Sequence, residues 1–139
     1  MVFNKKPGLD FVNQLGKDNM PGFLDINFTK IGDDFLEAEM PVSNKTKQPM
    51  GLLHGGANVV LAETLGSIAA ILTLDMDTHY AVGLEINANH LRAVKEGKVT
   101  GRATPLHIGR KTQVWEIKIT DNKGKLSCIS RITMAILQK

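Results

Sequence analysis

One segment of the chain, residues 57–74, restricts the folds that this sequence can adopt. Its apolar residues are distributed around the whole circumference of a helix, and a helix that is apolar on every side is a buried helix. The segment is shorter than the roughly 20 residues of a membrane span and contains Glu63, Thr64 and Ser67, so we expect no membrane partner. Its small residues would let other elements pack closely; they are Ala57, Ala62, Gly66, Ala69 and Ala70.

The segments around this helix alternate between apolar and polar residues, as strands with one buried face do. We predict a short helix at residues 9–15 and a loop at residues 43–53. The predicted strands are residues 23–31, 35–42, 80–92, 98–105, 111–120 and 125–137. Turn-forming residues at 32–34, 96–97 and 121–124 indicate hairpins between consecutive strands, which would then run antiparallel.

This order of elements predicts one domain, residues 1–139, with an α+β fold. A buried helix needs cover on more than one side, so we expect one antiparallel sheet that curls around a single central helix. A single chain of this length would leave part of that helix uncovered. We therefore expect a homo-oligomer, either a dimer or a dimer of dimers.

The charges are distributed unevenly along the chain, whose net charge is +3. Residues 1–79 contain six basic and ten acidic residues, whereas residues 80–139 contain eleven basic and four acidic ones. This asymmetry indicates an anionic partner, either nucleic acid or a phosphorylated small molecule, unless the basic residues only form a solvated strand face. One Trp, one Tyr and the lack of any nucleic-acid-binding motif favour the small molecule over nucleic acid.

Two features point to the cytoplasm. The single cysteine, Cys128, cannot form an internal disulfide, which is typical of a reducing compartment. Lys5 and Lys6 near the start are followed by no apolar stretch, so we expect no cleaved secretory signal.

Glu63 is the most informative residue because it lies in the middle of the apolar helix. Burying an ionised carboxylate costs several kcal/mol unless the group is paired or hydrogen-bonded. A catalytic carboxylate would explain its place, and so would a Glu that reaches solvent or a subunit boundary. Ser67 lies one turn later on the same face, either as a hydrogen-bond partner of Glu63 or as a small residue tolerated for packing.

A glycine pair, Gly55 and Gly56, follows His54 at the predicted start of the same helix. Such glycines bring free N–H groups close to a bound atom, and the helix N-terminus adds a positive dipole, so the segment suits an oxyanion hole as well as an ordinary turn. Nine residues separate His54 from Glu63, a helical rise of about 13 Å. A substrate or a second copy of the chain could lie between them.

Other chemistries have little support. The four histidines are scattered and form no metal-binding motif, and the Gly-x-Ser-x-Gly, Walker A and Gly-x-Gly-x-x-Gly motifs are absent. We therefore expect no metal site, and any chemistry rests on a carboxylate.

Three stretches resemble the hotdog-fold acyl-CoA thioesterases, and within that family the enzymes that act on aromatic acyl groups. The likeness extends over residues 20–137. The stretches are residues 48–67, with the run His54-Gly55-Gly56 and the later Glu63, residues 82–90 and residues 105–109.

The resemblance implies a role for each matching residue. Glu63 matches the carboxylate that activates water or attacks the thioester, and the N–H of Gly55 matches the donor to the thioester carbonyl. Gln48 and His54 match the residues that orient the carbonyl and the water, and Ser67 matches the hydroxyl beside the carboxylate. In this family the site lies at a dimer interface and draws on both chains.

The resemblance also implies a coenzyme A site, with no cofactor beyond the coenzyme A of the substrate. The matching residues are Val82, Asn89, His90, Leu91, Arg92, Leu106, His107, Ile108, Gly109, Arg110 and Lys111.

We therefore expect hydrolysis of an aromatic acyl-CoA thioester, such as a dihydroxynaphthoyl thioester of quinone biosynthesis. The alternatives are proofreading of a misloaded aryl carrier protein, acyl-CoA binding without hydrolysis, and dehydration of hydroxyacyl thioesters. The residues expected near the acyl group are Gly66, Ser67, Ala70, Met50, Leu53 and Ile68.

Overall fold

The structure is a computed structural model that describes residues 1–4 and 7–139. Lys5 and Lys6, on which the signal-sequence prediction partly rests, lie outside the described residues.

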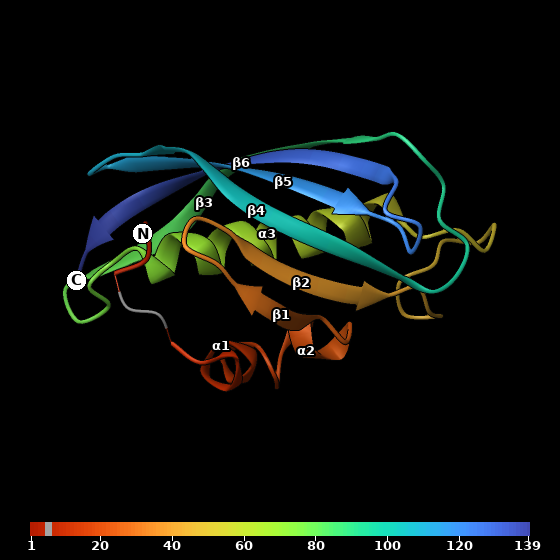
Figure 1. Cartoon of the computed structure of the whole chain (residues 1–139), viewed down its shortest axis with the longest axis horizontal. Helices are drawn as coiled ribbons and strands as arrows, with labels where there is room; N and C mark the ends of the chain where they lie inside the picture. The colour runs from red at the N-terminus through yellow and green to blue at the C-terminus, as the bar shows by residue number, and fades with distance from the viewer. Residues whose placement is uncertain (5–6) are drawn as a thin grey trace.

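One long helix, α3 (Gly55–Leu72), lies against a sheet that curves over it (Figure 1). In the described part of the chain this sheet has six strands in the order β1-β2-β4-β5-β6-β3, and every neighbouring pair is antiparallel. The strands are β1 (Asn27–Ile31), β2 (Leu36–Pro41), β3 (His79–His90), β4 (Lys98–Ile108), β5 (Thr112–Thr120) and β6 (Leu126–Gln138). The predicted α+β architecture, a curled antiparallel sheet around a central helix, is confirmed.

Two short helices, α1 (Leu9–Leu15) and α2 (Met20–Phe23), precede the sheet and lie beside β1 (Figure 1). The prediction for α1 is confirmed with both of its bounds. The predicted strand at 23–31 is wrong in its first part, because residues 20–23 form α2 and β1 begins only at Asn27. Pro21 in the first turn of α2 suits a helix start, where its missing N–H costs nothing.

Glycines allow the close approach of α3 to the sheet. A Cβ atom at Gly66 would overlap the Cγ2 methyl group of Ile132 on β6. A Cβ atom at Gly101 on β4 would lie 2.5 Å from Leu65 Cδ1. The helix therefore packs against the sheet with its small face, and Leu61 and Leu65 are fully buried in the core.

The sheet covers only one side of α3, so the expectation of a helix buried on every side is wrong for a single chain. Val59 and Val60 remain half-buried, and Glu63 is exposed. By length and composition α3 could span a membrane, but half of it is buried inside the protein, as is usual for a core helix.

The C-terminal end of α3 is held by a buried polar chain. Trp115 Nε1 donates to Gln113 Oε1 at 2.9 Å, and Gln113 Nε2 donates to Thr73 Oγ1 at 2.8 Å. Phe3 stacks on Trp115 with the ring centroids 6.3 Å apart, and the Asn4 N–H donates to the carbonyl of Leu72. The N-terminal residues thus close this end of the core.

One predicted hairpin is absent and two are confirmed, the first of them β1 with β2 across residues 32–34. β3 does not pair with β4, as residues 96–97 suggested, but with β6 at the sheet edge. β4 instead pairs with β2 and β5, and the Gly97 carbonyl accepts from the Val42 N–H beside β2. The turn at residues 121–124 joins β5 and β6 as expected, with Asp121 Oδ1 accepting from the N–H groups of Lys123 and Lys125.

The contact at Gly66 gives a prediction about stability. Ala is a better helix former than Gly by about 1 kcal/mol, so propensity alone would make Gly66→Ala stabilising. We expect the opposite, a loss of about 1–3 kcal/mol in the free energy of unfolding, because the new methyl group overlaps Ile132. Urea unfolding measures this. Adding Ile132→Leu, which lacks the Cγ2 methyl, should recover part of the loss, and a stabilised single variant would contradict the packing.

Candidate active site

The residues matched to the oxyanion hole meet at the N-terminal end of α3. His54 caps the helix, and its Nδ1 accepts from the Gly56 N–H at 2.8 Å. The first N–H groups of a helix have no carbonyl one turn earlier, and the described residues offer no acceptor to the Gly55 N–H. A Cβ at Gly55 would lie 2.7 Å from His90 Nε2, so a glycine is needed for the ring to lie there. The arrangement leaves the Gly55 N–H available to an oxyanion.

A cavity of about 300 Å³ lies beside this helix end. It brings Gln48 together with residues 90–92 of the predicted coenzyme A site and with Asn58, for which the sequence predicted no role. The lining residues are Gln48, Leu52, Leu53, Asn58, His90, Leu91, Arg92 and Ala93.

Glu63 lies further along α3, next to the edge strand. Its Oε1 would be 3.0 Å from a Cβ atom at Gly83, so the glycine on β3 makes room for the carboxylate. Ser67 Oγ lies 4.0 Å from Met134 Sδ, and no hydrogen bond joins it to Glu63 in the described part of the structure. The exposed carboxylate is therefore open to a ligand on the side of α3 that the sheet leaves uncovered.

A second cavity, of about 290 Å³, begins at Glu63 and extends between α3 and the two short helices. Apolar residues of α1, α2 and β1 line one side of it, and α3 lines the other. The lining residues are Val12, Leu15, Gly16, Asn19, Pro21, Phe28, Glu63, Thr64, Ser67 and Ile68.

This cavity contains some of the residues expected near the acyl group. Ser67 and Ile68 line it, whereas Gly66 and Ala70 are buried in the core, Leu53 lines the cavity of about 300 Å³ at the start of α3, and Met50 is 81% exposed on its loop. Gly66 and Ala70 do not line this cavity because the small residues of α3 face the sheet. The contributions from α1 and α2 were missed, although the apolar face of residues 9–15 was a usable signal.

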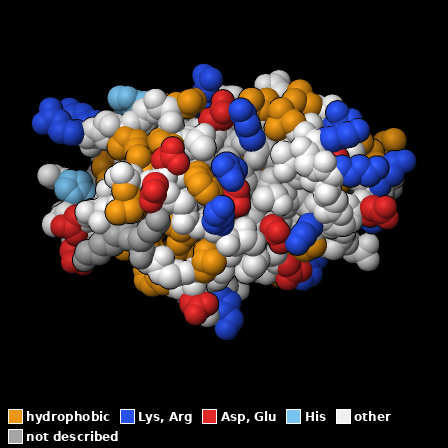
Figure 2. Space-filling view, in the orientation of Figure 1, with side chains coloured by type: hydrophobic (Ala, Val, Ile, Leu, Met, Phe, Trp, Pro, Cys, Tyr) orange, Lys and Arg blue, Asp and Glu red, His pale blue; other side chains and the backbone are white. Residues whose placement is uncertain are grey.

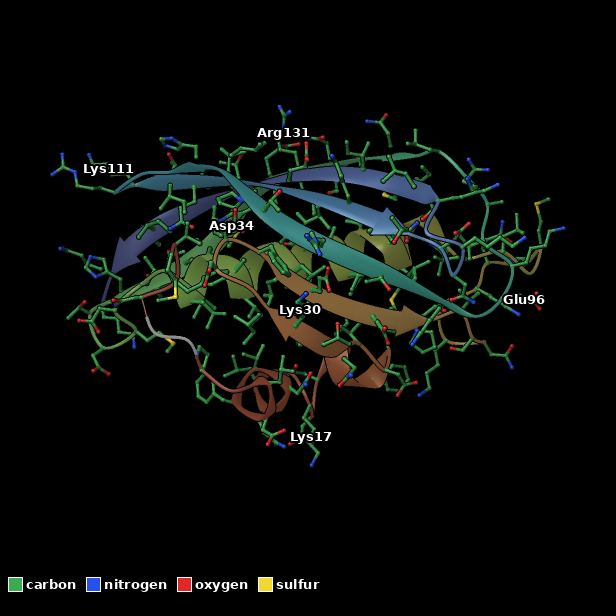
Figure 3. The ribbon with its side chains drawn as sticks, in the orientation of Figure 1. Lys17, Lys30, Asp34, Glu96, Lys111 and Arg131 are labelled. Carbon is green, nitrogen blue, oxygen red and sulfur yellow. The ribbon has the colours of Figure 1, made fainter. Side chains whose placement is uncertain are left out.

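The other part of the predicted coenzyme A site, residues 106–111, lies at the opposite end of the molecule from residues 90–92. Ile108, Gly109, Arg110 and Lys111 line a cavity of about 840 Å³ near the C-terminal end of α3. Figure 3 shows Lys111 and Glu96, which belongs to the loop after β3, at opposite ends of the structure. Figure 2 shows Lys and Arg side chains at both of these ends. One chain therefore does not bring the two segments together.

The edge strand β3 runs along the uncovered side of α3. Within the described residues its outer side pairs with no other strand, and Val82 and Leu84 are exposed on it. His90 at one end of β3 contacts Gly55, and Gly83 nearer the other end contacts Glu63. The two parts of the predicted catalytic site thus lie along one open edge, separated by about 13 Å of helix rise.

Cysteine and metal chemistry gain no support from the geometry. Burial raises the pKa of the Cys128 thiol, which keeps it protonated and unreactive. Across residues 1–4 and 7–139, no three His, Cys, Asp or Glu side chains are grouped as metal ligands would be. The expectation of no metal site remains a prediction.

Comparisons with known proteins agree with the geometry. The thioesterase superfamily model matches residues 50–128. The 1,4-dihydroxy-2-naphthoyl-CoA hydrolase of Escherichia coli is 56% identical over 137 residues, 99% of this chain and 100% of that protein. The proofreading thioesterase EntH of Cronobacter sakazakii is 49% identical and covers 99% of both chains. The solved structure of a mutant thioesterase PA1618 from Pseudomonas aeruginosa superposes with a TM-score of 0.99 at 46% identity, over 100% of both chains.

The family match over residues 50–128 and the curled sheet around α3 lead to the same assignment. The chain belongs to the thioesterase superfamily, and its fold is the hotdog fold of that family.

Proposed function

We propose that this thioesterase hydrolyses aromatic acyl-CoA thioesters and that Glu63 is its catalytic carboxylate. One observation carries the proposal: in a chain of this family, an exposed carboxylate stands at the start of a mainly apolar cavity of about 290 Å³. The thioester carbonyl would lie at Glu63, and the acyl group would extend toward α1 and α2.

The size and lining of the cavity support an aromatic acyl group. Its volume of about 290 Å³ is at the lower end of ligand sites, which suits one or two rings. The aromatic ring of Phe28 lines the cavity, and aromatic groups pack well against one another. The E. coli relative is named for a dihydroxynaphthoyl thioester, so we propose this group, and with it a step of quinone biosynthesis, for the present chain.

A carrier-protein thioester is the second candidate. The likeness to a proofreading thioesterase supports it, because such an enzyme would act on a misloaded aryl carrier protein. The basic residues Arg92, Arg110 and Lys111 favour coenzyme A, whose phosphates they would bind. The enzyme would work in the cytoplasm and need no cofactor besides the coenzyme A of its substrate.

The site would be assembled from two chains. Glu63 of one protomer would face Gly55, Gln48 and His54 of its partner, because the same chain holds these groups too far apart. The free edge of β3, which runs beside both groups, supports this arrangement since an unpaired strand is a ready surface for a second copy.

The proposed reaction uses two groups on the thioester. The Gly55 N–H would donate to the carbonyl oxygen as negative charge develops there. Glu63 would either take a proton from the attacking water or attack the carbonyl carbon itself. In both routes the carbon–sulfur bond breaks, the thiol leaves with a proton, and water supplies the oxygen of the carboxylic acid.

Replacing the carboxylate tests its role. Glu63→Gln should lower kcat by roughly 10²–10⁴-fold with a far smaller change in KM, because the group acts in the chemical step. The assay is release of free thiol from an aromatic acyl-CoA, a product that a dehydratase or a binding protein would not form. Glu39→Gln is the matched control, since Glu39 pairs with Lys98 at 2.8 Å on the outer face of the sheet. A folded Glu63→Gln enzyme with normal kcat would refute the mechanism.

The acyl cavity predicts substrate selectivity. We expect kcat/KM for 1,4-dihydroxy-2-naphthoyl-CoA or benzoyl-type thioesters to exceed that for palmitoyl-CoA by at least about tenfold, or roughly 1.4 kcal/mol of transition-state stabilisation. A long alkyl chain would not fit in the small cavity beside Glu63. Steady-state kinetics on the three thioesters measure the ratio. Equal turnover of palmitoyl-CoA would disprove the aromatic specificity while leaving the hydrolase activity intact.

A further inference from the structure

Asn58 is a buried polar side chain whose contacts are incomplete. It lies on α3 and is only 4% exposed. Its Oδ1 is shielded from solvent and accepts no hydrogen bond from any residue that the structure describes. Because a buried acceptor without a donor destabilises the folded state, such a group calls for a partner outside the chain.

The position of Asn58 indicates where that partner would come from. Asn58 lines the cavity of about 300 Å³ together with Gln48 and His90. It is three residues after Gly55 and therefore lies on the same side of the helix. His90 joins the two, because its ring packs against Gly55 while it also lines the cavity. A thioester bound at the Gly55 N–H would thus have its thiol portion next to Asn58.

The lining of the cavity fits the thiol portion of such a substrate. Leu52, Leu53 and Ala93 offer apolar surface to methylene groups, whereas the Asn58 carboxamide offers an acceptor. In a pantetheine thioester the first N–H lies three bonds from the sulfur, at the end of two methylene groups. The terminal torsion of Asn is broad, so a rotation about the Cβ–Cγ bond turns Oδ1 toward the cavity that the side chain lines.

We propose that Asn58 accepts a hydrogen bond from the amide N–H nearest the sulfur of the substrate's pantetheine arm, and that it selects thioesters that carry this amide. The inference rests on the proposed hydrolase function and deepens it. It names the determinant for the thiol side of the substrate, which coenzyme A and a carrier protein share.

Two thioesters of the same aromatic acid test this assignment. One contains N-acetylcysteamine, which has the amide. The other contains 2-acetoxyethanethiol, in which an ester oxygen replaces the N–H. Wild-type enzyme should prefer the amide thioester by about five- to tenfold in kcat/KM, the effect of about one hydrogen bond. Asn58→Leu should bring this ratio close to one by slowing the amide thioester alone.

Thermal unfolding separates this role from a structural one. Asn58→Leu removes a buried acceptor that has no partner among the described residues of the chain, so Tm should not fall. Asn44→Leu, at an exposed asparagine, is the control and should leave both the ratio and Tm unchanged. If Asn58→Leu does not fold, Asn58→Ala provides the same kinetic comparison with a smaller side chain.

The outcomes are distinct. A ratio that Asn58→Leu leaves unchanged, or a lower Tm with both thioesters slowed equally, would overturn the assignment and mark Asn58 as a structural residue. Equal kcat/KM values for the two thioesters with wild-type enzyme would overturn it as well. Turnover of the corresponding acyl-CoA with neither short thioester hydrolysed would overturn this assignment alone. Release of no thiol from the acyl-CoA either would refute the proposed function, and this inference with it.

Discussion

The structure depends on the packing of one helix, α3, against the concave face of one sheet. α3 approaches β4 and β6 closely because glycines stand at the contacts, Gly66 on the helix and Gly101 on the sheet. Six strands curved in this way cover one side of a helix but not the other. Consequently the opposite side of α3, including Glu63, stays open although it belongs to the most apolar segment of the chain.

The open side is where the proposed chemistry lies. A carboxylate on the helix face that the sheet leaves uncovered is exposed in the single chain. In the proposed dimer, substrate and a second chain would enclose it. The free edge of β3 runs along the same side and contacts both Gly55, through His90, and Glu63, through Gly83. In the proposed dimer there would be two sites, and each chain would contribute Glu63 to one of them and Gly55, Gln48 and His54 to the other.

Much of this could be predicted from the sequence, for reasons that are local. The helical segment α3, the alternation in β2 and the turn at residues 121–124 each depend on neighbouring residues, and all three were predicted, although α3 begins and ends two residues before the predicted 57–74. The pairing of β3 with β6 was not predicted, because the order of strands in a sheet depends on which of several strands pairs at each edge. The exposure of Glu63 did not follow from the expected burial of the whole helix. Hydropathy alone does not show which side of a helix the sheet covers. The residues proposed for the oxyanion hole belong to a contiguous motif, whereas the cavity proposed for the acyl group combines residues of α1, α2, β1 and α3 that meet only through tertiary packing.

The claim that each site draws on two chains is tested most directly by mixing two inactive variants. Glu63→Gln and Gln48→Ala, each tagged differently, would be unfolded together and refolded at equal concentrations, and hybrids identified by double-tag purification. If the sites are shared, the mixture should recover about a quarter of wild-type activity, because half of the dimers are hybrids and each hybrid contains one intact site. If hybrids form and the activity stays at the level of the separate variants, each site is confined to one chain and the account is contradicted.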